Sequence, residues 1–172
     1  VFFVSTQHVL NPHNWLPYTR HCAQTQWTDL QAVPDNLAWE YFNGMTPDQL
    51  AYCGKHELIT LGAHTVSHPF LTTCDDQSLW YEFSEAKRQL ESMSGQPINI
   101  LAYPSGDYDG RVAETAHNAG YQYAFALTPR KVGLPQYEIP RVYVGDSYLF
   151  TLDVKLSGLH LQPLRKAISA RN

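Results

Sequence analysis

The sequence lacks an excess of basic residues and lacks any long apolar run. Twelve Lys and Arg against sixteen Asp and Glu give a net charge of −4, so a basic surface that could coat phosphates is not expected and nucleic acid is not a predicted partner. No apolar stretch reaches the roughly 18 residues that a membrane-spanning helix needs. The apolar opening, Val1 to Val4, is too short and uncharged for a signal peptide.

Cysteine pairs, repeats and linkers are also lacking. Cys22, Cys53 and Cys74 form no C-x-x-C, so neither a zinc knuckle nor a disulfide framework is indicated. Hydrophobic residues make up 44% of the 172 residues and charged residues 16%, which disfavours a disordered chain. We therefore expect a single domain over residues 1–172 with one buried core.

Two helices carry clear end signals. Thr46-Pro47-Asp48-Gln49 combines an N-cap, a proline and an N3 glutamine, which predicts a helix that ends near Gly54. A second helix is predicted over residues 76–93, closed by Gly95, from apolar residues at steps of four and three. These residues are Leu79, Phe83, Ala86, Leu90 and Met93.

Strand and helix patterns alternate along the chain. Strands are predicted at residues 1–4, 58–62, 98–103, 121–127 and 141–144, and a short helix at 110–118. Such alternation is typical of an α/β fold with parallel strands, whose sites lie at the carboxyl ends of the strands. Candidate chemistry should therefore follow each strand directly.

Two histidines lie at one of these strand ends. His64 and His68 are four positions apart between Gly62 and Pro69, close enough for both imidazoles to reach one metal ion if the backbone turns there. The zinc-protease motif is excluded because Thr65 stands where it requires Glu. A bare H-x-x-x-H also fits capping or surface histidines, so both interpretations stay open.

Four segments together resemble the polysaccharide deacetylase family, the NodB homology domains of carbohydrate esterase family 4. They are Leu-Gly-Ala-His-Thr-Val-Ser-His-Pro at 61–69, Leu-Ala-Tyr-Pro-Ser-Gly-Asp-Tyr at 101–108, Ala-Gly-Tyr at 119–121 and Ile-Pro-Arg-Val at 139–142. The resemblance covers residues 1–4 and roughly 46–157. It leaves the aromatic-rich stretch 5–45 unmatched, where the rings could pack in the fold or stack on sugars.

The resemblance implies a distorted (β/α) barrel with fewer than eight strands and metal-dependent hydrolysis of acetyl groups on an acetylated glycan. It implies that His64 and His68 bind a divalent metal, zinc being the first expectation. Tyr103, Pro104, Gly106 and Asp107 become a groove wall for the substrate, and the backbone N–H of Ser105 faces the oxyanion. Localisation to the cell envelope, the periplasm or the exterior follows from the resemblance alone.

The family's Thr-Phe-Asp-Asp motif and first barrel strand would precede Val1. We therefore expect an N-terminally incomplete domain without the two aspartates, which supply the third metal ligand and the general base. The missing base alone predicts a rate loss of about 10²–10⁴-fold. This chain by itself could thus be inactive, and a carbohydrate-binding domain of the same fold, lacking catalysis, is the alternative. A third interpretation is an α/β domain whose histidines are only structural.

Smaller departures concern single residues. Ala102 stands where many family members carry an arginine, and Arg141 could supply that charge by orienting an acid. Asp107 is expected to cap the helix that follows it, and Asp75-Asp76 to cap the long helix. His160 lies in a Leu-His-Leu context similar to the family's late histidine, although its spacing does not fit.

Overall fold

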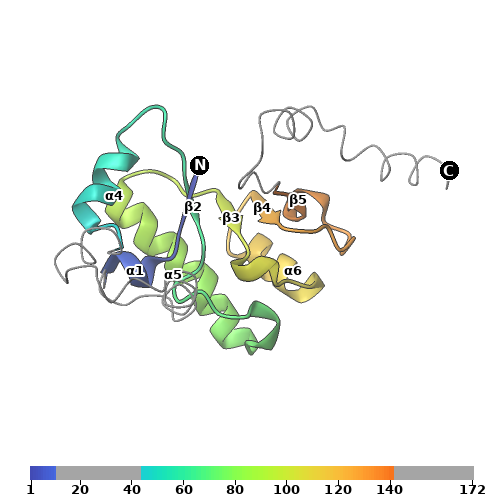
Figure 1. Cartoon of the computed structure of the whole chain (residues 1–172). Coiled ribbons are helices and arrows are strands. Elements are labelled where there is room, and N and C mark those ends of the chain that lie inside the picture. The colour runs from blue at the N-terminus through green and yellow to red at the C-terminus, as the bar shows by residue number, and fades with distance from the viewer. Residues whose placement is uncertain (11–43, 142–172) are drawn as a thin grey trace, which may run out of the picture. The chain divides into compact units, whose positions relative to one another are not determined.

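The computed structural model describes residues 1–10 and 44–141 (Figure 1). The chain divides into two compact units, residues 1–140 and 141–172. Within the second unit only Arg141 is described, so the expectation of one domain over residues 1–172 stays a prediction. The fold below is that of the first unit.

In the part of the chain that is described, five parallel strands form one sheet in chain order. They are β1 (Phe2–Val4), β2 (Leu61–Ala63), β3 (Ile100–Ala102), β4 (Tyr123–Ala126) and β5 (Ile139–Pro140). The α/β class with fewer than eight strands is therefore confirmed. Because neighbouring strands are parallel, all five end at the same edge of the sheet.

Among the described residues, four helices accompany the strands. They are α1 (Thr6–Leu10), α4 (Pro47–Gly54), α5 (Asp76–Ser94) and α6 (Gly110–Asn118), joined by the 3₁₀ turns η2 (Leu71–Thr73), η3 (Pro104–Gly106) and η4 (Pro135–Tyr137). Helix α5 packs between α4 and α6 (Figure 1). No helix among residues 1–10 and 44–141 is long and apolar enough to cross a membrane.

The end signals predicted for α4 and α5 are confirmed. Thr46 and Gln49 form a reciprocal capping box at α4. Asp75 accepts the Ser78 N–H at the start of α5, and Gly95 ends that helix with φ of 70°. The expected cap at Asp107 is wrong, because Asp109 caps α6 by accepting the Val112 N–H at 2.8 Å.

The strands predicted at 1–4, 58–62, 98–103 and 121–127 begin one to three residues later than expected, and β2 differs most. Strand β2 starts at Leu61, because the Ile59 N–H donates to the His56 carbonyl in a turn and leaves Leu58 83% exposed. The last described strand is Ile139–Pro140, whereas the predicted strand 141–144 lies outside the described residues except for Arg141. A short apolar run does not mark its own boundaries, since pairing partners decide them.

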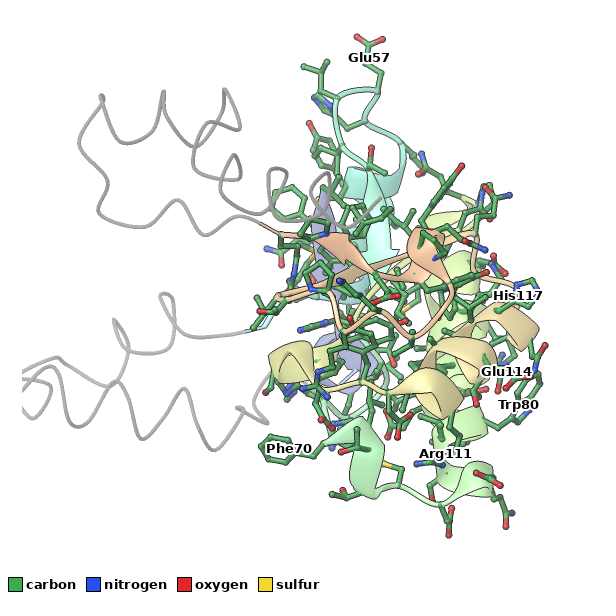
Figure 2. All side chains as sticks on the ribbon, turned by 90° about the vertical axis from the view of Figure 1, so that its right-hand side faces the viewer. Glu57, Phe70, Trp80, Arg111, Glu114 and His117 are labelled. Carbon is green, nitrogen blue, oxygen red and sulfur yellow. The ribbon has the colours of Figure 1, made fainter. Side chains whose placement is uncertain are left out.

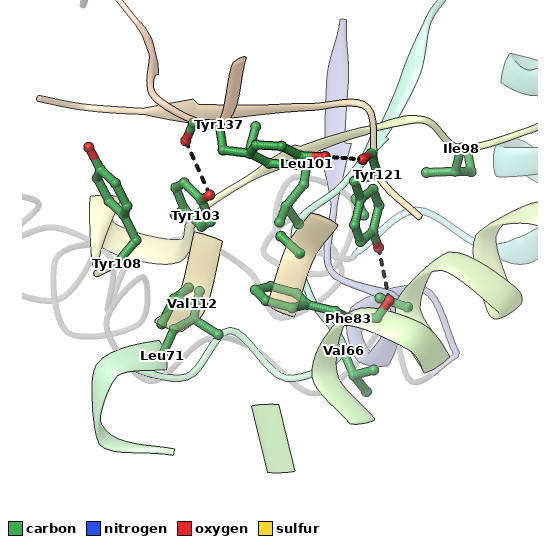
Figure 3. Close-up of a cluster of buried hydrophobic side chains, with 14 of the residues drawn as sticks. Val66, Leu71, Phe83, Ile98, Leu101, Tyr103, Tyr108, Val112, Tyr121 and Tyr137 are labelled. Carbon is green, nitrogen blue, oxygen red and sulfur yellow. Dashed lines mark hydrogen bonds between the residues drawn. The ribbon is translucent and has the colours of Figure 1, made fainter. Parts of the chain in front are cut away.

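The core lies between the sheet and α5 and α6, and it is rich in tyrosine (Figure 3). The hydroxyl of Tyr103 donates to the Tyr137 carbonyl, that of Tyr137 to the Tyr121 carbonyl, and that of Tyr121 to the Phe83 carbonyl. Each buried hydroxyl thus has a backbone partner, as burial of a polar group requires. Burial raises the pKa of Tyr103 and Tyr121 far above the ordinary value, so these hydroxyls stay protonated.

Candidate functional site

The site is built where three strands end together. β1 is followed by Ser5, β2 by His64 and β3 by Tyr103. The His64 N–H donates to the Val4 carbonyl at 2.9 Å, and the Ser5 hydroxyl donates to the His64 carbonyl at 2.8 Å. Both contacts therefore hold the backbone of His64 to the end of β1.

The two histidines lie together. Their ring centroids are 4.8 Å apart and the ring planes are inclined by 77°. Nδ1 of His64 is 2.6 Å from the Ala102 carbonyl. Because a carbonyl only accepts, Nδ1 carries the proton, and the lone pair of this imidazole is on Nε2. A backbone carbonyl that fixes the tautomer in this way is common behind histidines that bind metals.

The environment of His68 favours its neutral form. Burial lowers the pKa of His68 below its ordinary value, and the nearby His8 lowers it further, against the opposite effect of a backbone hydrogen bond. Metal binding requires a neutral imidazole. His68 is thus suited to act as a ligand near neutral pH.

The loop that carries them has an uncommon backbone conformation. Thr65 and His68 have φ values of 68° and 61°, a region that costs non-glycine residues energy, above all β-branched ones. Hydrogen bonds hold the loop: the His68 N–H donates to Thr65 Oγ1, and the Thr6 and Gln7 N–H groups of α1 donate to the carbonyls of residues 65 and 66. The strain is therefore maintained by its surroundings.

Glu82 of α5 contacts this loop, and the sequence did not single it out. Its Oε2 accepts the N–H groups of Val66 and Ser67 at 2.8 and 2.9 Å, and its Oε1 accepts the Ser67 hydroxyl at 2.5 Å. Glu82 directly precedes Phe83 and lies beside the apolar face of α5. A charged residue at such a position of an amphipathic helix is ordinarily exposed to solvent. No local signal distinguishes it from the exposed carboxylates of the same helix.

The turn after β3 contributes through its backbone. Tyr103 is fully buried, and its ring stacks on Tyr108 with centroids 4.6 Å apart. Pro104 and Gly106 are also buried, whereas Ser105 is exposed and has a φ of 55°. A groove wall made by this turn would therefore present Ser105 and peptide groups rather than the tyrosine ring.

Asp107 joins the two parts of the site. Its carboxylate accepts the N–H of Thr72 at 2.8 Å and lies 2.9 Å from the Thr72 hydroxyl. Arg111 of α6 reaches the same segment, where it donates to the carbonyls of Thr72 and Cys74 and pairs with Asp76 (Figure 2). The turn after β3 is thus tied to the segment that follows the histidines.

A substitution at Gly106 probes how closely the turn after β3 is packed. Its φ is 67°, and a Cβ built there would lie 2.8 Å from the side chain of Leu127. We expect Gly106→Ala to lower the free energy of unfolding by about 1–3 kcal/mol, because it adds strain and a steric clash. Urea denaturation measures this loss. Gly110→Ala is the matched control, since no atom lies near its Cβ position, and an equal loss in both variants would contradict the explanation.

The described residues fit part of a metal site. The two imidazoles are suitable donors for zinc, which takes nitrogen and carboxylate ligands and three or four protein groups in all. Within residues 1–10 and 44–141, no cluster of three or more His, Cys, Asp or Glu could hold a metal ion. His160, Cys22 and the aromatic residues between 11 and 43 lie outside the described residues.

Arg141 directly follows β5 and begins the second unit. Burial lowers its pKa from the ordinary value. The two units are described separately, so its expected part in the site stays a prediction.

Known structures share this fold. The chain is similar to a de-N-acetylase from Aggregatibacter actinomycetemcomitans, with a TM-score of 0.61, 15% identity, and coverage of 88% of this chain and 63% of that one. It is also similar to the Streptococcus pyogenes deacetylase PplD (TM-score 0.53, 20% identity, 58% and 45% covered) and to a Bacillus cereus polysaccharide deacetylase (0.52, 19%, 70% and 42%).

The chain spans between two fifths and two thirds of the length of these three proteins. No curated protein sequence matches it. The family model for polysaccharide deacetylase matches residues 1–124, well over half of the chain. That match includes both histidines and the turn after β3, and by it the chain belongs to the polysaccharide deacetylase family.

Proposed function

We propose that this chain is a metal-dependent deacetylase domain that removes acetyl groups from the N-acetyl sugars of a polysaccharide or oligosaccharide. The observation that carries the proposal is the histidine pair at the sheet edge, with rings 4.8 Å apart and the tautomer of His64 set by Ala102. Membership of the family supplies the reaction class. The cell envelope, the periplasm or the exterior is the proposed location, in keeping with a polymeric glycan substrate.

In this proposal His64 and His68 hold a divalent cation, zinc by preference. Bound there, the cation would supply Lewis-acid polarisation of an acetyl carbonyl. The backbone N–H of Ser105 would donate to the oxygen on which negative charge develops, since a preorganised donor acts most strongly where charge appears in the transition state.

The remaining residues of the proposed site bind and orient. Tyr103, Pro104 and Gly106 shape the groove wall, and Asp107 holds that wall to Thr72. Arg141 would orient an acid. Phe70, which follows the histidine loop, points away from the body of the unit and is 64% exposed (Figure 2). Its ring offers an apolar surface on which a sugar face could stack.

A carbohydrate-binding domain without catalysis is the second candidate. It is favoured by one observation: the described residues bring no carboxylate to the two histidines to complete a three-ligand group. A domain of this kind would keep the groove and bind glycan without releasing acetate.

Zinc titration of the chain tests the proposed metal site. We expect His64→Ala and His68→Ala each to weaken zinc binding by at least about 100-fold. Removing a ligand should lower the zinc affinity at least as much as removing a contact that supports a ligand. His56→Ala is the matched control, since His56 lies after α4 and its imidazole accepts the Leu58 N–H, away from the histidine loop. Unchanged affinity in both site variants would refute the metal site.

Acetate release separates the two candidate functions. Acetylated glucosamine oligomers are incubated with the zinc-loaded chain, and free acetate is quantified. Release that disappears in His64→Ala supports the deacetylase. Zinc binding and oligomer binding without acetate release would favour the carbohydrate-binding domain.

A further inference from the structure

We propose that Glu82 is a positioning residue that holds the loop 64–68 in the conformation that brings the two imidazoles together. The inference rests on the proposed function, because it assigns Glu82 a part in the metal site of that function. It goes further in naming a residue that is remote in sequence and offers no ligand itself.

Both carboxylate oxygens of Glu82 are used on the loop. Oε2 accepts two successive backbone N–H groups, those of Val66 and Ser67, and Oε1 accepts the Ser67 hydroxyl. Glu82 is buried, with 7% of its surface exposed. Hydrogen bonds to an ionised group are about twice as strong as neutral ones, so this contact fixes the middle of the loop firmly.

The loop needs such a contact because its ends are strained. Thr65 and His68 flank the two residues that Glu82 binds, and both have positive φ. A non-glycine residue in this region is strained and persists there only when its surroundings hold it. Released from Glu82, the loop would relax toward ordinary φ values, and His68 would rotate away from His64.

The position of Glu82 argues against an ordinary helix role. It is the seventh residue of α5, which starts at Asp76, so it lies beyond the first turn where acidic residues favour the helix dipole. Glu85, on the same helix, makes the usual surface pair with Arg88. Glu82 instead turns inward to the loop after β2.

Glu82→Ala is expected to lower zinc affinity by about 10- to 100-fold, the range seen when a supporting contact behind a metal ligand is lost. Hydrogen exchange at the Val66 and Ser67 amides should become at least about tenfold faster, because both lose a charge-assisted bond. Glu82→Gln keeps an acceptor oxygen and should recover most of the affinity. Glu85→Gln, the matched control on α5, should change neither measurement.

The outcomes separate this inference from the proposed function. If His64→Ala leaves zinc binding unchanged, the metal site itself fails. If the histidine variants lose zinc but a folded Glu82→Ala chain binds it within about twofold of the original, the positioning role is overturned. If Glu82→Ala does not fold, the double variant Glu82→Gln with Ser67→Ala is measured instead. A reduced zinc affinity of that variant supports the positioning role of Glu82, and an unchanged zinc affinity overturns it.

Discussion

Replacing Glu138 by Ala is expected to lower the free energy of unfolding by about 3–5 kcal/mol. Each buried donor left without a partner costs about 1–3 kcal/mol, and water that enters to bind some of these donors reduces the total. Glu138 is buried, with 7% exposure, directly before β5. Its carboxylate accepts three successive backbone N–H groups, those of residues 130, 131 and 132, at 2.8, 2.5 and 2.8 Å.

The same carboxylate supports the turn after β3. Glu138 lies 3.1 Å from the Tyr108 hydroxyl, and Tyr108 stacks on Tyr103. Without Glu138, the loop 128–133 and the stacked rings both lose their anchor. The effect should therefore extend to the segment that carries Ser105.

Urea denaturation followed by circular dichroism measures this effect. Glu138→Gln keeps one acceptor and should lose about half as much, since hydrogen bonds to a charged group are roughly twice as strong as neutral ones. Glu57→Ala, at an exposed position, is the control and should stay within about 0.5 kcal/mol of the original. A loss below about 1 kcal/mol for Glu138→Ala would show that water satisfies the loop amides equally well.

Phe83→Ala is expected to cost about 3–5 kcal/mol, the usual range when a large aromatic side chain is removed from a core. Phe83 has no exposed surface, and its ring meets that of Tyr121 edge to face at 6.2 Å. Its carbonyl also accepts the Tyr121 hydroxyl at 2.9 Å. The cavity would open between α5 and the sheet, and the surrounding structure could relax to fill it only in part.

Thermal and urea unfolding of the same variant give the magnitude. Phe83→Leu fills most of the volume and should lose less than half as much, since the residual cavity is smaller. Tyr81→Ala is the matched control, because that ring is 53% exposed on the same helix and a surface change costs about 0.5 kcal/mol or less. Equal losses in Phe83→Ala and Tyr81→Ala would contradict the packing shown in Figure 3.

The two carboxylates, Glu82 and Glu138, show why contacts matter more than charge in this protein. Both are buried and both accept hydrogen bonds from loop amides. One binds the histidine loop and the other binds the loop before β5. A neutral substitution that keeps an acceptor should therefore cost less than truncation at either position.

The helices α4, α5 and α6 and the class of the fold followed from the sequence, whereas α1 did not. Helix α5 was predicted over residues 76–93 and spans Asp76–Ser94, because its N-cap, its apolar spacing and Gly95 are local signals that act within a few residues. The alternation of strands and helices predicted parallel strands for the same local reason. The expectation that the histidines follow a strand was met by β2.

Contacts between distant segments were decided by the tertiary structure alone. The start of β2 depended on pairing with β1 and β3, which a run from Leu58 to Gly62 does not specify. Asp107 was expected to cap a helix but binds Thr72, and Glu82, which the sequence did not single out, binds the histidine loop. Sequence by itself determined where helices α4 and α5 begin and which residues could carry chemistry, because those signals are local. Only folding brought the partners within hydrogen-bond distance across 15 to 35 residues of chain.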